Sequence, residues 1–273
     1  MYINSEQVTV KALLLKFLKM REIGALIPLV VIFVIASFSN SAFTSLPNLL
    51  NMLRASAYIF IAAVGMTYVL CGRGLDLSIG SQVGMSGVVL GALMVWWNVP
   101  IVLAIFIALL VGALAGAING FFVVVLRVPP FIATLATFYG YRGILEGVTK
   151  GTPISPMPES FKIIGLGSLF GVAYVIWFMI FLFIVATFVL RKTKYGRYTL
   201  AMGGNPQSTR LAGISTKKLT FSLYVLMGVL ACIAGIFFTS RFSSALPTLG
   251  VGMELKVIAA CIIGGVSLFG GAG

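Results

Sequence analysis

Apolar runs of about 20 residues recur along this chain of 273 residues, and they constrain its fold more than any other feature. A helix needs about 20 residues to cross the ~30 Å hydrocarbon core of a bilayer, so each run predicts one membrane span. Backbone polar groups in lipid must be satisfied within the protein, which leaves helices or a closed barrel, and continuous rather than alternating runs exclude the barrel. Only 9% of the residues are charged, whereas soluble domains carry roughly 25%. We therefore expect an all-α polytopic membrane protein.

The runs predict about eight transmembrane helices, with more expected in a complete protein. They cover residues 23–38, 52–71, 79–97, 100–126, 131–148, 172–190, 219–239 and 257–269. Basic and apolar residues mix in the preceding segment 1–22, which is typical of an interfacial amphipathic segment on the cytoplasmic side. A cleaved signal peptide is the rival interpretation, but no soluble mature domain follows it. Residues 23–273 are thus expected to form a single transmembrane domain.

Positive charges between the spans predict an orientation. The segment 191–218 is the longest polar interruption, and it carries seven Lys and Arg residues with no Asp or Glu. Because cytoplasmic loops are enriched in Lys and Arg, we expect this segment, Arg127 and both chain ends in the cytoplasm. The interruptions expected outside, at 39–51, 150–171 and 241–256, are much less basic. The parity of eight crossings agrees with this charge bias.

The composition also excludes several kinds of function. The net charge of +13 comes from loops and span ends, without a basic run interleaved with aromatic residues, so we expect no nucleic-acid partner. The chain has no His and no GxxxxGKS/T phosphate loop, which removes the commonest general base and one common way of binding ATP. Its three cysteines lack metal-like spacing, and they give no basis for a disulfide. We expect this chain to have no enzymatic activity, metal or cofactor of its own.

A short helix signal lies inside the segment 191–218. Asn205 suits the N-cap, Pro206 suits the first helical position and Gly213 suits the residue just past the end. These residues alone leave two interpretations open. The segment is an ordinary solvated loop whose charge sets the orientation, or its helix is a coupling element on which a separate motor protein pushes.

Polar residues at membrane depth are the candidates for a translocation path. Asp76 lies in the turn GRGLDLS at 72–78, where it caps the next helix or lines a path, and the two roles are compatible. Asn119 either forms hydrogen bonds between helices or contacts a ligand. Arg142 and Glu146 are four residues apart, so we expect them to pair on one helix face.

Small residues repeat on one face of two predicted spans. Such a face lets two helix backbones approach closely in a membrane. The third span has them at Gly80, Gly84, Gly87 and Gly91, and the fourth at Ala108, Gly112, Gly116 and Gly120. We expect helix packing in particular at Gly80, Gly84, Gly112 and Gly116.

Four stretches of the chain resemble one known family. They are GRGLDLSIGS at 72–81, AGAINGFFVVVLRVPPFIATLATFYGYRGI at 115–144, KYGRYTLAMGGNPQSTRLAGIS at 194–215 and MELKVIAACIIGGVSLFGGAG at 253–273. In content, order and spacing they resemble permease subunits of bacterial ABC importers for monosaccharides, the ribose, xylose, arabinose and galactose group. The runs at 141–143 and 258–265 resemble permeases for rhamnose or autoinducer-2. Family members usually continue past the last motif, so the chain is expected to be shortened at its C-terminus.

The resemblance implies a permease of an ATP-driven importer in the bacterial plasma (inner) membrane. Its expected partners are a second permease subunit, identical or different, a cytoplasmic ABC ATPase that binds ATP and Mg²⁺, and a periplasmic or lipoprotein sugar-binding protein. In this family the ATPase docks on a short helix, which falls here within 203–214. The residues implied for this coupling are Asn205, Pro206, Gln207, Arg210, Leu211 and Gly213.

Two other functions are weighed against a sugar importer. An ion-coupled secondary carrier needs an isolated acidic or His residue within a span, and this sequence has no clear one. A related permease for another small solute, such as branched-chain amino acids, shares the superfamily. Neither the particular sugar nor the identity of the partner permease follows from these residues.

Overall fold

The computed structural model describes residues 21–273, so the expected amphipathic segment 1–22 lies almost wholly outside the described residues. The expected all-α class is confirmed, since the only strands there are the two-residue strands of a short hairpin. The helices are α2 (Arg21–Ser39), α3 (Leu46–Cys71), α4 (Ile79–Gly91), the π-helix η1 (Ala92–Trp96), α5 (Ile101–Val124), α6 (Pro130–Thr149), α7 (Glu159–Leu166), α8 (Tyr174–Lys192), α9 (Lys194–Gly204), α10 (Pro206–Leu211), α11 (Thr216–Phe242) and α12 (Met253–Ile263). The strands are β1 (Ser168–Leu169) and β2 (Val172–Ala173).

Five helical segments of the described chain are long and apolar enough to cross a membrane. They are α3, α4 with η1, α5, α8 and α11. The apolar part of α2, Leu26–Ser39, is shorter. The 20 residues of α6 include several polar side chains, and this helix is not among the five. The structure therefore gives a polytopic helical membrane protein with fewer membrane-length helices than the eight expected.

The expected span at 257–269 is not confirmed as a helix of membrane length. In its place α12 has 11 residues, and at 1.5 Å per residue it is ~16 Å long, about half the thickness of the hydrocarbon core. The helix ends at Ile263 because Gly264 and Gly265 follow, and Gly265 takes a φ of 93°. The chain still passes along the bundle, since Ala245 pairs with Ile154 near one end and the Gly271 N–H donates to the Cys71 carbonyl at the other.

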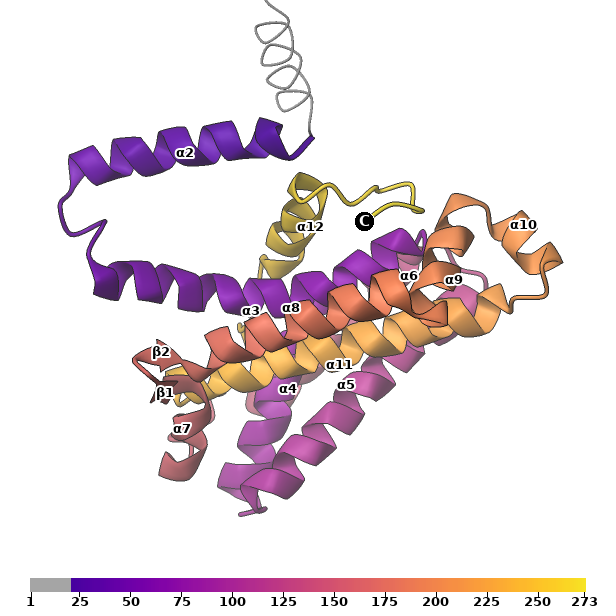
Figure 1. Ribbon diagram of the computed structural model, residues 1–273. Helices are drawn as coiled ribbons and strands as arrows, with labels where there is room; N and C mark the ends of the chain where they lie inside the picture. The colour runs from indigo at the N-terminus through magenta and orange to yellow at the C-terminus, as the bar shows by residue number, and fades with distance from the viewer. Residues whose placement is uncertain (1–20) are drawn as a thin grey trace, which may run out of the picture.

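Helix α11 is the centre of the bundle, and it packs against α3, α4, α5 and α7. Figure 1 shows α10 at one end of the bundle, α7 with the hairpin at the other, and α2 at the side, where it contacts α12. The contact between α5 and α11 is close because small residues face each other. A β-carbon at Gly112 would lie 2.7 Å from the Gly228 carbonyl oxygen, and one at Gly116 would overlap the Tyr224 carbonyl.

Two glycines of α4, Gly80 and Gly84, face an irregular segment, whereas Gly87 faces Thr239 of α11. Gly80 lies against the Gly250 carbonyl, and a β-carbon at Gly84 would lie 2.8 Å from the Leu249 carbonyl oxygen. The side chain of Arg142 on α6 meets the same place, 3.1 Å from that β-carbon position. The small-residue face thus lets a segment of consecutive turns, residues 247–252, pass beside α4.

The expected ion pair between Arg142 and Glu146 is wrong. The Arg142 guanidinium is buried and donates hydrogen bonds to the carbonyl oxygens of Pro247 and Leu249, the latter at 3.2 Å from both terminal nitrogens. Glu146 is exposed, and the salt bridge found among the described residues joins Lys162 to Glu159. Non-helical backbone at membrane depth needs partners for its carbonyl groups, and Arg142 supplies donors to the carbonyls of this turn.

Two interruptions contain more structure than expected. The segment 150–171 folds into α7 and β1, and a pair of hydrogen bonds between Ile154 and Ala245 ties it to the chain after α11. The basic segment 191–218 contains a second helix, α9, before the short one that was expected. Both elements shape the ends of the bundle, where the candidate sites lie.

Candidate functional site

The short helix expected in the basic segment is present as α10. The Asn205 side-chain oxygen accepts a hydrogen bond from the Ser208 N–H at 2.9 Å, and Pro206 occupies the first turn. The Thr209 hydroxyl donates to the Asn205 carbonyl at 2.8 Å, and Thr209 is buried. Gly213 follows the helix with a φ of 82°, a conformation that glycine adopts without strain. Local chemistry at both ends therefore fixes α10.

The outer surface of α10 is open to solvent. Leu211 is 85% exposed, and Gln207 and Arg210 are exposed as well. The helix rests mainly on α9 and α11, and it projects from the end of the bundle (Figure 1). An exposed leucine beside an arginine on a short, capped helix offers an apolar and a cationic contact to a partner.

A hollow of about 490 Å³ lies beside α10. Its lining comes from α9, from the turn after α10 and from α11, and includes Tyr195, Tyr198, Gly213, Lys218 and Ser222. Tyr195 and Ser222 share a hydrogen bond of 3.0 Å between their hydroxyl groups. Burial raises the pKa of Tyr195, and this hydrogen bond opposes the increase. The tyrosine is therefore a neutral hydroxyl that joins α9 to α11.

The backbone of α9 touches two other segments immediately before α10. Gly203 is buried against the Cys71 carbonyl at the end of α3 and against the Gly271 nitrogen of the chain after α12. The Gly271 N–H donates to that same Cys71 carbonyl at 3.0 Å. In addition, Arg73 Nε donates to the Phe269 carbonyl at 2.8 Å. We call this meeting of 71–73, 203–204 and 269–271 the glycine joint.

The turn that leads away from the glycine joint carries Asp76 into a buried polar network. One Asp76 carboxylate oxygen accepts from the Ser78 N–H at 2.8 Å and from the Ser78 hydroxyl at 2.6 Å. The other accepts from the side-chain amides of Gln82 and Asn119, each at 3.2 Å. The Asn119 oxygen in turn accepts from the Thr137 hydroxyl at 2.6 Å. The network thus joins the α3–α4 turn to α4, α5 and α6.

The structure therefore brings together the two residues expected at the translocation path. Asp76 and Asn119 share a hydrogen bond, and both side chains are 0% exposed. Ser78 occupies the N-cap position of α4. The backbone N–H that donates to Asp76 is that of Ser78, and Asp76 accepts from no backbone N–H in the first turn of the helix. In this conformation the pair connects helices, and neither residue lines the hollow beside α10 or the aromatic groove at the other end of the bundle.

Several members of these sites were not expected from the sequence. Ser78 and Gln82 belong to the network, and their spacing of four residues on a predicted helix could have indicated a shared face. Thr137 lies in the predicted span 131–148, and nothing in the sequence indicates its hydrogen bond with Asn119. No sequence signal pointed to Gly203, because its partners come from chain segments 132 and 68 residues away, at Cys71 and Gly271.

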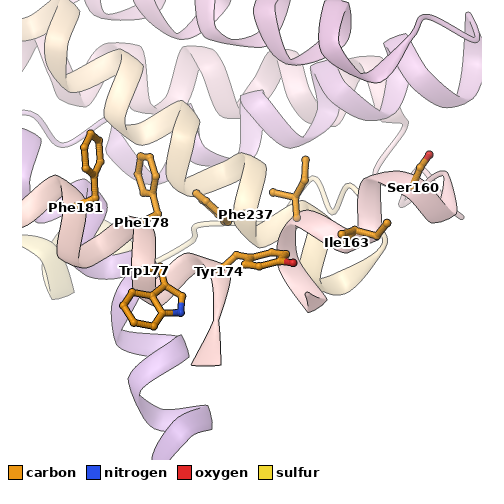
Figure 2. A pocket seen from close by; sticks show the side chains of 8 residues that line it. Ser160, Ile163, Tyr174, Trp177, Phe178, Phe181 and Phe237 are labelled. Atoms are coloured by element: carbon orange, nitrogen blue, oxygen red, sulfur yellow. The ribbon is translucent and has the colours of Figure 1, made fainter. Parts of the chain in front are cut away.

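The end of the bundle opposite α10 carries an aromatic groove of about 530 Å³. Figure 2 shows Tyr174, Trp177, Phe178 and Phe181 of α8 beside Phe237 of α11, with Ile163 of α7 closing one side. Aromatic side chains with a polar edge gather where membrane meets water. This groove therefore belongs to the membrane-facing surface.

A bundle of membrane-length helices with an exposed, capped helix at one end defines a polytopic helical membrane protein. The chain belongs to the family described as branched-chain amino acid transport system / permease component, whose model matches residues 48–272. No solved structure matches the chain.

Several proteins similar to this chain have names that state what they import. The ribose import permease protein RbsC of Haemophilus influenzae is 42% identical over 92% of this chain and 79% of its own length. RbsC of Escherichia coli K12 is 40% identical over the same shares. The autoinducer 2 import system permease protein LsrC of Escherichia coli O9:H4 is 37% identical over 95% of this chain and 76% of its own length. The chain is thus similar to permeases named for sugar and for autoinducer import.

Proposed function

We propose that this chain is the membrane-spanning permease subunit of an ATP-driven importer for a monosaccharide. The family match and the ribose and autoinducer-2 permeases among its relatives support this assignment. Other subunits supply the remaining functions: an external protein delivers the sugar, a second permease completes the path, and a cytoplasmic ATPase binds ATP and Mg²⁺. The chain itself contributes helices and has no catalytic role.

The orientation places the N-terminus and α10 in the cytoplasm. The segment 191–218 that contains α10 carries seven Lys and Arg residues and no carboxylate, as the positive-inside rule requires of a cytoplasmic segment. Helices α2 and α6 then cross the bilayer together with the five longer segments. The chain from Ala245 to Gly271 makes the eighth passage, partly as turns whose carbonyls accept from Arg142, and returns to the cytoplasmic end.

The ATPase docks on α10, and the observation that carries this role is the 85% exposure of Leu211 on a helix capped at both ends. Gln207, Arg210 and Leu211 form the contact surface, while Asn205, Pro206 and Gly213 hold the helix in shape. The ATPase pushes on α10, and the glycine joint passes the displacement to the end of α3. The turn at 72–78 carries it on to the Asp76 network between the membrane helices.

An ion-coupled carrier is a weaker alternative. Such a carrier needs an ionisable group that is free to exchange its ion, whereas Asp76 accepts hydrogen bonds from Ser78, Gln82 and Asn119. A permease for branched-chain amino acids fits the family description, but the relatives at 37–42% identity carry sugar and autoinducer names. The substrate test below separates these possibilities.

The docking role is tested by changing Arg210→Ala together with Leu211→Glu. The complete importer, with its own ATPase and binding protein, is purified and reconstituted in proteoliposomes. We expect the ATPase to be lost from the purified complex and uptake of labelled ribose to stop. The control Arg191→Ala with Leu169→Glu changes an arginine and an exposed leucine away from α10, and it should keep both.

Each outcome decides one part of the proposal. Undiminished ATPase binding and uptake in the α10 variant would refute the docking assignment. Uptake by the unaltered protein that is driven by an ion gradient without ATP would favour the carrier. Uptake of leucine or valine in place of any sugar would favour the amino-acid permease.

A further inference from the structure

Two arginines meet one buried tyrosine at the end of the bundle opposite α10. Arg54 lies one turn before Tyr58 on α3, so both side chains share a face of that helix. The guanidinium carbon of Arg241, in the last turn of α11, lies 5.9 Å from the centre of the Tyr58 ring and 5.8 Å from that of Phe242. Both arginines are partly exposed and lie within electrostatic reach of the Tyr58 hydroxyl, whereas Tyr58 is 1% exposed.

The side chains of this cluster have hydrogen-bond donors without acceptors. Within the described part of the chain, the Tyr58 hydroxyl and Arg54 Nε are buried donors without an acceptor, and the Arg241 guanidinium that lies close to the hydroxyl is itself a donor. Among the residues that the structure describes, neither arginine forms a salt bridge with a carboxylate. A buried donor without an acceptor costs free energy, and so does a partly buried cation without a counter-charge. An anion with several acceptor oxygens satisfies the donors and both charges at once.

Arg241 is partly held in position for such an anion. Its guanidinium lies within cation–π distance of Tyr58 and of Phe242, and the Tyr58 ring packs on Phe238 with centroids 4.8 Å apart. Cation–π contacts restrain a guanidinium, which can then bind a phosphate through two parallel N–H donors. Little conformational entropy remains to be lost when the anion arrives.

The surroundings indicate a phosphate that is attached to a lipid. Leu53 and Phe242 beside the arginines are 41% and 50% exposed, so the site opens towards an apolar surface. The aromatic groove of Figure 2 begins one helical turn from Arg241, at Phe237 on the same side of α11. Helices α3 and α11 are membrane spans with this site at their ends, where lipid headgroups meet hydrocarbon.

We propose that Arg54, Arg241 and Tyr58 bind the phosphate of a phospholipid, one acyl chain of which lies in the aromatic groove. The two guanidinium groups donate to the phosphate oxygens, and the Tyr58 hydroxyl donates to a third. The site is independent of the docking of an ATPase on α10. It gives this end of the bundle one fixed lipid in place of a freely exchanging one.

The first experiment counts phospholipids retained by the protein. The complete importer is extracted from membranes in a mild detergent, and bound lipid is measured by native mass spectrometry and by phosphorus analysis. We expect one tightly held phospholipid per permease chain, with retention falling at least tenfold in the double variant Arg54→Gln, Arg241→Gln. Tyr58→Phe should reduce retention a few-fold, because it removes one donor and keeps the ring.

A matched control removes the same charge from the same end of the molecule. Lys150→Gln with Lys162→Gln takes away two cations outside the site, and it should retain the lipid. Arg241→Lys keeps the charge but loses the planar donor pair, so we expect intermediate retention. A variant counts only if it elutes as the same assembly as the unaltered protein. Equal lipid retention in the arginine variant and the lysine control would overturn the proposal.

The second experiment separates lipid from other sources of an anion. Phosphatidylglycerol with a fluorescent acyl chain is titrated onto delipidated importer, with inorganic phosphate as competitor. Binding that withstands millimolar phosphate supports the lipid. Displacement of the lipid by phosphate alone assigns the site to free phosphate and overturns the proposal. A second result would also overturn the proposal: the arginine variant binds lipid normally but loses affinity for the external binding protein. The anion that meets the arginines would then be a carboxylate of that protein.

Discussion

The sharpest test of the route from α10 into the membrane is the substitution Gly203→Ala. A β-carbon at Gly203 would fall well inside 3.0 Å of the Cys71 carbonyl oxygen and of the Gly271 nitrogen. Both neighbours are backbone atoms, so α9 or the chain after α12 has to move. Overpacking of this kind costs about 1–3 kcal/mol, and loss of the hydrogen bond between Gly271 and Cys71 costs roughly 1 kcal/mol more.

We therefore expect Gly203→Ala to lower the free energy of unfolding by about 2–4 kcal/mol. The exposed surface of α10 is unchanged, so the ATPase should still copurify. Sugar uptake per ATP hydrolysed should fall, because a displacement of α10 no longer reaches the end of α3. The assays are unfolding of the detergent-solubilised importer, subunit copurification, and paired measurements of uptake and ATP hydrolysis in proteoliposomes.

The next residue provides the control. A β-carbon at Gly204 would meet nothing within 4 Å, and alanine favours a helix over glycine by about 0.5–1 kcal/mol. Gly204→Ala should therefore keep stability and coupling. If Gly203→Ala behaves like Gly204→Ala in all three assays, the glycine joint does not transmit a displacement of α10 to α3, and the proposed route through Cys71 is refuted.

Three further substitutions test single contacts. Asn205→Ala removes the cap of α10 and should cost about 1 kcal/mol, seen as faster hydrogen exchange confined to 205–213. Arg142→Ala leaves the carbonyl groups of 247 and 249 without donors and should cost about 2–5 kcal/mol, measured by thermal unfolding, while Glu146→Ala on the exposed side of α6 should cost little. Asp76→Ala strands the donors of the buried network and should cost about 2–4 kcal/mol, whereas Asp76→Asn, which still accepts through its oxygen, should cost less.

Local chemistry made some elements predictable. The helix α10 follows from Asn205, Pro206 and Gly213 alone, since each satisfies or ends the backbone within three residues of its own position. The membrane-length helices follow from apolar length, because a bilayer leaves the backbone few alternatives. In both cases the deciding interactions lie close together in the sequence or act on a whole segment.

The partners of buried polar groups depended on tertiary structure. Glu146 lies at the right helical spacing to pair with Arg142. The spacing does not reveal that the turn at Leu249 brings a backbone carbonyl to the Arg142 guanidinium. The length of α12 was overestimated for a related reason. Apolar composition continues past Ile263, whereas the positive φ of Gly265 ends the helix. Asp76 and Asn119 were each singled out as polar residues in apolar surroundings, but only the fold brings their side chains together.

The two ends of the bundle combine rigid contacts with open surfaces in different ways. At the α10 end, contacts between backbone atoms leave almost no freedom between α9, the end of α3 and the chain after α12, while Leu211 projects freely. If an ATPase docks on α10 as proposed, a force applied there would act on the whole joint and, through Asp76, on three more helices. At the other end, Arg241 lies within cation–π distance of two aromatic rings and forms no salt bridge among the described residues. A binding surface is favoured when its contacting side chain is unpaired and the backbone beneath it is rigid. Such a surface is preorganised, so little conformational entropy is lost when the partner binds.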